Sequence, residues 1–200
     1  MPLQYRKVIT EFNQIIQTFT PEDNFLINSF SSRYLAFDNY INHQALTEKE
    51  NSDGVTYIVL DEKTKAEKIL VAYYTISAYT IHFKDEYDYS DETIPNEEKL
   101  IYYSPISAFM INMSVVNKNY QDTLYNGKVI SNLILMNILH ELYQMSINIV
   151  GAKRIILCSV KDAVNFYSRN HFCKFTDSLT LLDKFIDDTI PMYLSLHDIT

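Results

Sequence analysis

The chain has 200 residues, which suits one globular domain with a core of its own. Hydrophobic residues make up 47% and charged residues 21%, a balance that excludes a disordered chain. The formal net charge of −8 argues against a general nucleic-acid-binding surface.

Several sequence features bear on the compartment and on cofactors. The stretch MPLQYRKVITEF at the N-terminus lacks the apolar core of a signal peptide, and no apolar run reaches membrane-spanning length. Two cysteines, Cys158 and Cys173, are too few for a disulfide framework, and the five histidines are scattered. We therefore expect a cytoplasmic protein with no membrane contact and no metal.

The hydrophobic pattern predicts helices and strands along the whole chain. In chain order we expect an amphipathic helix over 29–46, a hairpin of strands over 55–60 and 69–83, a strand over 104–116, a largely buried helix over 129–150, a strand over 155–160, a short helix over 161–170, and final strands in FCKFT and PMYLSL. This order predicts an α/β fold with a mixed, mainly antiparallel, twisted sheet flanked by helices. The strand, helix and strand over 106–160 form the predicted βαβ unit.

One segment is strongly acidic. KDEYDYSDETIPNEEK, residues 84–99, carries seven acidic residues against two lysines. It has two interpretations: a solvated insertion within a single domain over 1–200, or an electrostatic guide for a cationic amine.

A polar loop lies between the strand over 104–116 and the buried helix. Such a position suits an anion, because free backbone N–H groups point outward there and the helix dipole favours negative charge. The stretch YNGKVIS adds Gly127 for close approach and Lys128 for charge. Taken alone, the pattern is equally that of an ordinary helix start.

Four stretches together resemble the GNAT superfamily of N-acetyltransferases. They are MSVVNKNYQ, NGKVISNLIL, GAKRIILCSV and AVNFYSRNHF, and the front half is similar to the branch of acetyltransferase toxins from toxin–antitoxin pairs. The resemblance implies the GNAT-like fold, acetyl-CoA as co-substrate and a loop that holds its pyrophosphate. The residues that it implies for binding acetyl-CoA are Val115, Val116, Gln121, Asn126, Gly127, Lys128, Val129, Ile130, Ser131 and Asn165.

The loop departs from the pattern of the family. Either about five residues are inserted after Gln121, or Tyr125 and Asn126 replace the usual Tyr-Gln. In both alignments Val129 and Ser131 stand where glycine or alanine is usual, and a later glycine is replaced by His171. The loop is therefore a degenerate version of the pyrophosphate-binding motif of the resembled family.

The resemblance also implies the chemistry. An amine would attack the thioester directly, with a backbone N–H near Val115 and Val116 contacting the developing oxyanion. Tyr167 would protonate the leaving thiolate, which suits a phenol because its ordinary pKa of about 10 keeps it protonated at neutral pH. The alternative for Tyr167 is a packing aromatic, one of 16 tyrosines. No residue is identifiable as the general base.

Three functions follow as hypotheses. The first is an N-acetyltransferase acting on an unidentified primary amine. The second is a toxin-type enzyme acting on aminoacyl-tRNA, which a neighbouring gene for a DNA-binding antitoxin would favour. The third is a non-catalytic binding domain that retains the fold. The charge of −8 and the acidic segment count against the tRNA hypothesis, and nucleic acids other than tRNA are not expected. The fold is compatible with a homodimer.

Overall fold

The computed structural model describes residues 7–64, 67–87, 100–176, 179–180 and 188–199. The chain forms two compact units, Met1–Ser77 with Ile111–Leu142, and Ala78–Met110 with Tyr143–Thr200. Three elements contribute residues to both units: strand β4 (Glu67–Tyr87), strand β5 (Leu100–Val116) and helix α4 (Ile130–Asn148).

The first unit is built on antiparallel strands. Its sheet runs in the order β2 (Gln14–Thr18), β3 (Val55–Thr64), β4 and β5. Ile16 pairs with Val59 and Ile58 pairs with Tyr73, so β-branched and aromatic residues face each other across the ladder. This confirms the hairpin that the sequence predicted, with β4 longer than expected at both ends.

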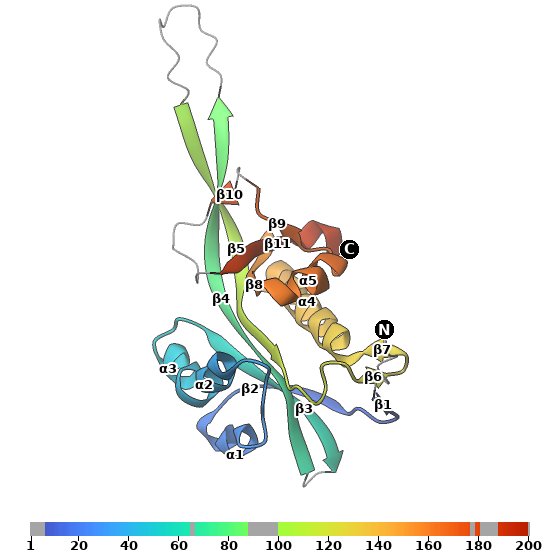
Figure 1. Cartoon of the computed structure of the whole chain (residues 1–200). Coiled ribbons are helices and arrows are strands. Elements are labelled where there is room, and N and C mark those ends of the chain that lie inside the picture. Colours follow the sequence, from blue (N-terminus) through green and yellow to red (C-terminus); the bar gives the residue numbers. More distant parts are fainter. Residues whose placement is uncertain (1–6, 65–66, 88–99, 177–178, 181–187, 200) are drawn as a thin grey trace, which may run out of the picture. The chain divides into compact units, whose positions relative to one another are not determined.

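Three short helices cover this sheet, in place of the single helix predicted over 29–46. They are α1 (Asn24–Ile27), which follows a 3-10 turn at Pro21–Asp23, α2 (Leu35–His43) and α3 (Ala45–Glu50). The start of the predicted helix is wrong because Ser32 forms local bonds instead. Its N–H donates to Asp38 Oδ1 at 2.8 Å and its hydroxyl donates to the Tyr34 carbonyl at 2.8 Å. Figure 1 shows the three helices gathered beside β3 and β4.

The core of the first unit lies between these helices and the sheet. Phe19, Ile41, Ile58, Leu60 and Leu70 are almost completely buried there. A network of polar side chains runs through this core. The Tyr40 hydroxyl donates to Glu48 Oε2 at 2.6 Å and lies 3.1 Å from Thr75 Oγ1, which lies 2.8 Å from Thr56 Oγ1.

The second unit contains the remaining strands of the sheet. Next to β5 comes β8 (Arg154–Val160), then β11 (Thr189–Ser195), then β9 (Cys173–Lys174). Strand β11 is antiparallel to both neighbours, and β10 (Leu179–Thr180) pairs with β4. The strand, helix and strand of the predicted crossover are therefore β5, α4 and β8, with the two strands as neighbours in the sheet.

The short helix predicted over 161–170 has two parts. A 3-10 turn, Lys161–Ala163, leads into α5 (Val164–Arg169), and a further 3-10 turn, Leu196–Ile199, ends the described chain. The N-cap residue of α5 is Ala163, and it makes no side-chain capping bond.

The acidic segment lies mostly outside the described residues, since residues 88–99 are not described. Among the described residues, no helix combines the length and the apolar character that a membrane crossing requires.

Buried tyrosines make a prediction about alkaline pH. Burial and a hydrogen bond to Glu48 raise the pKa of Tyr40 to about 12, and burial also raises the pKa of Tyr73 and Tyr74. A folded pKa above the unfolded value of about 10 means that the folded state holds its proton longer. The stabilisation is fully present below about pH 10 and is lost as pH rises through the folded pKa.

We expect the free energy of unfolding to fall between pH 10 and 12, by about 2–3 kcal/mol for Tyr40 alone. Urea unfolding at a series of pH values, followed by tyrosinate absorbance, measures this. The Tyr40→Phe variant should be less stable at neutral pH but should lose less stability above pH 10. An equally steep decline in that variant would remove Tyr40 from the explanation.

Candidate functional site

The end of strand β5 is held by a buried side-chain amide. Asn117, 2% exposed, donates from Nδ2 to the carbonyls of Leu70 at 3.3 Å and Ser29 at 3.5 Å. Its backbone N–H donates to the Val71 carbonyl at 2.8 Å, and its Oδ1 accepts from the Asn119 N–H at 3.1 Å. The chain therefore leaves the sheet in a fixed direction, directly after Val115 and Val116.

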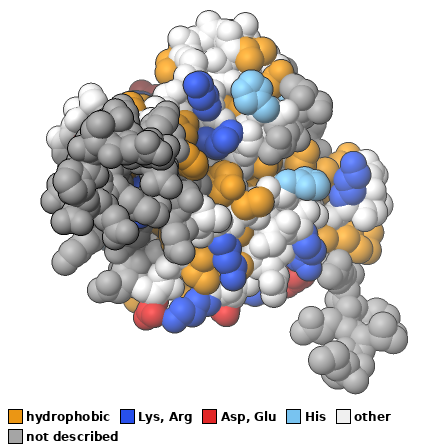
Figure 2. Space-filling model, turned by 90° about the horizontal axis from the view of Figure 1, so that it is seen from above, with side chains coloured by type: hydrophobic (Ala, Val, Ile, Leu, Met, Phe, Trp, Pro, Cys, Tyr) orange, Lys and Arg blue, Asp and Glu red, His pale blue; other side chains and the backbone are white. Residues whose placement is uncertain are grey.

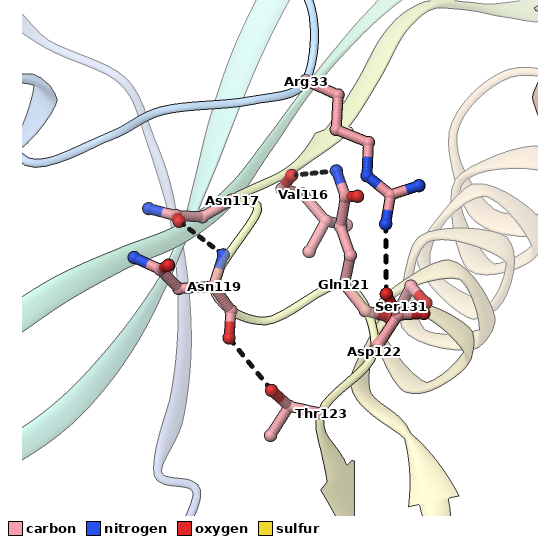
Figure 3. A network of polar contacts seen from close by, with 8 residues as sticks. All are labelled: Arg33, Val116, Asn117, Asn119, Gln121, Asp122, Thr123 and Ser131. Carbon is pink, nitrogen blue, oxygen red and sulfur yellow. Dashed lines mark hydrogen bonds and ion pairs between the residues drawn. The ribbon is translucent and has the colours of Figure 1, made fainter. Parts of the chain in front are cut away.

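Gln121 links the end of this strand to the start of helix α4. Its Nε2 donates to the Val116 carbonyl at 2.9 Å, and its own carbonyl accepts from Ser131 Oγ at 3.3 Å (Figure 3). Val115 is buried and belongs to the core of the first unit, while Val116 is half-buried. The structure thus brings four of the predicted residues together: Val115, Val116, Gln121 and Ser131.

The residues between Gln121 and the helix form a small hairpin. Strands β6 (Leu124–Tyr125) and β7 (Lys128–Val129) pair antiparallel, and Asn126 and Gly127 turn the chain with φ of 49° and 74°. Two successive positive φ angles in a two-residue loop are those of a type I′ turn, for which Asn-Gly is the preferred pair. This arrangement favours the alignment with an insertion after Gln121.

The hairpin changes the roles of two predicted residues. Gly127 supplies the positive φ of the turn, and nothing lies within 4 Å of a Cβ built on it. Lys128 pairs with Tyr125 and is exposed. Val129 pairs with Leu124 and comes before the first turn of α4.

The hairpin also closes onto the first residue of the helix. The Ile130 N–H donates to the Thr123 carbonyl at 3.0 Å, and Thr123 is held in turn by a bond from its hydroxyl to the Asn119 carbonyl at 3.0 Å. Ile130 is fully buried. The first backbone donor of α4 is therefore satisfied within the loop, and a ligand would meet the helix from Ser131 onward.

A third strand, absent from the sequence-based expectations, supports the hairpin. Strand β1 (Val8–Ile9) pairs parallel with β6, with Val8 opposite Leu124. The Leu124 N–H donates to the Lys7 carbonyl at 2.8 Å, and the Lys7 ammonium lies 5.6 Å from the centre of the Tyr120 ring. Two residues are too short for a periodic signal, so the sequence pattern could not indicate this strand.

The surroundings of the loop are more basic than the chain as a whole. Residues 117–131 hold two lysines, Lys118 and Lys128, against one carboxylate, Asp122. Arg33 reaches this carboxylate, with Nη2 at 3.0 Å from Asp122 Oδ2. Figure 2 shows one face of the molecule, on which Lys and Arg side chains are spread among hydrophobic and uncharged ones, with Asp and Glu side chains along its lower edge. The loop itself therefore suits an anion, although the net charge of the chain is −8.

Tyr120, the residue before Gln121, belongs to a partly buried cluster with Asp61 and Lys63. Burial, and then the neighbouring carboxylate of Asp61, raise the pKa of Tyr120. Asp61 is completely buried and is paired with Lys63 Nζ at 2.6 Å, while its Oδ1 accepts from the Asn13 N–H at 3.0 Å. These bonds hold the Asp61 carboxylate of β3 in place beside Tyr120.

Tyr167 lies on α5 in the second unit and is 8% exposed. Its ring contacts the rings of Phe166 and Phe172, with centroids 5.2 and 5.6 Å away. Asn165, two residues earlier, is exposed.

The helix that carries Tyr167 ends in a Schellman motif. The Phe172 N–H donates to the Tyr167 carbonyl at 3.1 Å, and the His171 N–H donates to the Ser168 carbonyl at 3.2 Å. His171 takes the left-handed conformation that this motif requires, with φ of 68°. The glycine that the resembled family has at this position is thereby explained, because glycine adopts that conformation at the lowest cost.

A separate cleft of about 490 Å³ opens in the second unit. Its lining includes Thr80, His82, Ser107 and Phe109. Nδ1 of His82 is buried and has no hydrogen-bond partner among the described residues. None of the residues predicted to bind acetyl-CoA lines this cleft.

Comparisons with known proteins identify the fold. No family model matches the chain, and no curated protein matches it. Among solved structures, a tyrosine-to-phenylalanine mutant of the AtaT toxin matches with a TM-score of 0.69 at 12% identity, over 100% of this chain and 97% of that chain.

Two other solved structures carry ligands. AtaTR bound with acetyl-CoA matches with a TM-score of 0.67 at 14% identity, over 93% of this chain and 95% of that chain. AtaT complexed with acetyl-methionyl-tRNA matches with a TM-score of 0.64 at 14% identity, over 94% and 97% of the two chains. The chain has the fold of these toxins, which confirms the predicted GNAT-like α/β fold.

The left-handed residue after α5 leads to a stability prediction. Replacing His171 by glycine should raise the free energy of unfolding by about 1 kcal/mol, because it removes the clash of the Cβ atom at positive φ. Chemical unfolding of the two proteins measures the change. As the control, Ser168→Gly inside the same helix should lower stability by a similar amount. A destabilising His171→Gly would mean that the imidazole makes a compensating contact.

Proposed function

We propose that the chain is an acetyl-CoA-dependent N-acetyltransferase that moves an acetyl group to a primary amine. The observation that carries the proposal is the likeness of almost the whole chain to a solved toxin structure bound with acetyl-CoA. The fold alone does not fix a reaction, so the argument depends on what the residues of this chain can do.

The loop after β5 has the properties that the phosphates of an acyl-CoA need. It is locally basic, and it stands at the N-terminus of a helix of 19 residues, where negative charge is favoured. Gln121 and Asn117 fix its geometry from both ends. Ser131 offers a hydroxyl at the point where the family has a glycine.

The reaction would be a direct transfer. The amine nitrogen attacks the thioester carbonyl carbon, a C–N bond forms, the C–S bond breaks and the thiolate of CoA leaves. A backbone N–H near Val115 and Val116, whose strand end is held by Asn117, would donate to the oxyanion. Tyr167 would give its proton to the thiolate, and the proton of the amine passes to water.

The packing around Tyr167 supports a positioned proton donor. Its ring is clamped by Phe166 and Phe172, and its carbonyl accepts the N–H of Phe172. Solved neighbours in both AtaT and KacT carry a tyrosine-to-phenylalanine substitution.

The amino group of an aminoacyl-tRNA is the acceptor that we favour. A solved structure of AtaT contains acetyl-methionyl-tRNA, which is the product of such a transfer. The exposed cations Arg33, Lys118 and Lys128 near the loop give the RNA backbone a local positive surface despite the acidic total. An antitoxin partner would accompany this role, since AtaT is also solved with the C-terminus of the antitoxin AtaR.

The non-catalytic alternative depends on the three departures from the family pattern. Val129 lies in the hairpin before the helix, and His171 takes the conformation of the missing glycine. Ser131 is small and half-buried. None of these three departures requires that the loop be closed to a phosphate group. We therefore favour the acetyltransferase over the non-catalytic binding domain.

Binding and turnover test the enzyme directly. Calorimetric titration should give saturable binding of acetyl-CoA and CoA below millimolar concentration. Tyr167→Phe should keep that affinity while turnover falls by about 100-fold or more, because the leaving thiolate loses its acid. Tyr193→Phe, which removes the hydroxyl of another tyrosine of the second unit that packs against Phe175, serves as the matched control and should retain most of the turnover.

Two results would contradict this proposal. If neither acetyl-CoA nor CoA binds at millimolar concentration, the chain is a binding domain. If Tyr167→Phe turns over at the wild-type rate, Tyr167 is a packing residue and the thiolate is protonated by another group.

The acceptor is tested by comparing amines. We expect acetyl transfer from labelled acetyl-CoA to aminoacyl-tRNA, with a rate that falls steeply as salt rises, because RNA binding releases counterions. The same tRNA with a formylated amino group is the matched control and should not react. Transfer to a polyamine or an aminoglycoside, with none to aminoacyl-tRNA, would assign a small-molecule substrate.

A further inference from the structure

An ion pair crosses the loop beside the proposed co-substrate. Arg33, in the connection before α2, places Nη2 3.0 Å from Oδ2 of Asp122. Figure 3 shows this guanidinium reaching over Gln121 toward Asp122, next to Ser131 at the start of α4. Two segments far apart in the sequence thus meet at the loop.

Backbone hydrogen bonds near Arg33 and Asp122 hold this ion pair in place, and burial of the two side chains does not. The Lys118 N–H donates to the Ser31 carbonyl at 2.8 Å, which ties the segment of Arg33 to the loop. Asp122 follows Gln121, whose side chain is bonded to the end of β5. The two side chains themselves are 62% and 70% exposed. An exposed pair of this kind is worth at most about 1 kcal/mol, so a better anion can displace the carboxylate.

A phosphate is such an anion. It carries more charge than a carboxylate and can accept two parallel N–H bonds from a guanidinium. Asp122 is the only carboxylate of residues 117–131, and it occupies the loop where the proposed function needs phosphate oxygens. Once a phosphate binds, this carboxylate would lose its partner and repel the new anion.

We propose that Arg33 is a phosphate ligand of the acyl-CoA, and that Asp122 holds its guanidinium while no phosphate is bound. This inference rests on the proposed function and adds a residue outside the motif that suggested it. Asp122 then lowers the affinity for CoA and favours its release after transfer.

Affinity measurements on charge-matched variants test the pair. Arg33→Gln should weaken acetyl-CoA binding by about tenfold, the loss of one charged hydrogen bond. Asp122→Asn should strengthen it by about two- to fivefold, because the repelling and competing carboxylate is gone. Both effects should shrink as salt rises.

The second unit offers matched controls. Lys161 and Asp188 form a similarly exposed ion pair at 2.8 Å, 68% and 86% exposed. Lys161→Gln and Asp188→Asn make the same changes of charge, and neither should alter the affinity for acetyl-CoA. Acetyl-pantetheine, which lacks the nucleotide phosphates, should react with the same kcat/KM in wild type and Arg33→Gln. Measuring the affinity for dephospho-CoA, which lacks the 3′-phosphate but keeps the pyrophosphate, shows which of the two groups Arg33 contacts.

The outcomes are distinct. If wild type binds acetyl-CoA and Arg33→Gln binds it equally well, Arg33 is not a ligand. If Asp122→Asn weakens binding, the carboxylate orients Arg33 and does not compete with phosphate. If wild type fails to bind acetyl-CoA at all, the proposed function fails, and the role of Arg33 fails with it.

Discussion

The first unit depends on one buried amide, Asn117. A strand that ends inside a sheet leaves polar backbone groups that must find partners, and a buried group without one is costly. Asn117 supplies these partners by bonding to β4, to the segment before α2 and to the next turn of its own loop. The link made by Gln121, the position of Asp122 and the reach of Arg33 all follow from the direction in which the chain leaves the sheet there.

The second unit solves a similar problem at the end of a helix. Helix α5 has only six residues, so its last carbonyls make up much of its backbone polarity. The Schellman motif satisfies two of them and brings Phe172 against Tyr167 in the same step. The sequence FYSRNHF can therefore be understood as a helix end that also orients a tyrosine. His171 takes the place of the usual glycine, and its left-handed conformation costs backbone energy.

The sequence was informative where a pattern is long or a motif is complete. The hairpin of β3 and β4, the buried helix α4 and the strand β8 follow from periodicity over seven residues or more. The non-helical turn at Ser32 depends on single side chains that compete with the helix. Periodicity carries no signal for such local bonds.

In the loop, Asn126 and Gly127 are a strong hairpin signal that the resemblance to a phosphate-binding motif concealed. Arg33 was absent from the predicted residues because it lies 89 positions from Asp122. Only a folded chain brings such a pair together. Gln121 and Ser131 were found from the motif, since its spacing survives on both sides of the insertion.

The pairing of β1 with β6 has a consequence for how the chain folds. Val8 meets Leu124 across more than a hundred residues of chain, and only two residue pairs form when they meet. The entropy of closing so long a loop is repaid only after the intervening elements have packed. This small sheet should therefore be among the last parts to form and the first to open. The loop that we assign to the phosphates would then be completed by the earliest described residues of the chain, at the end of folding.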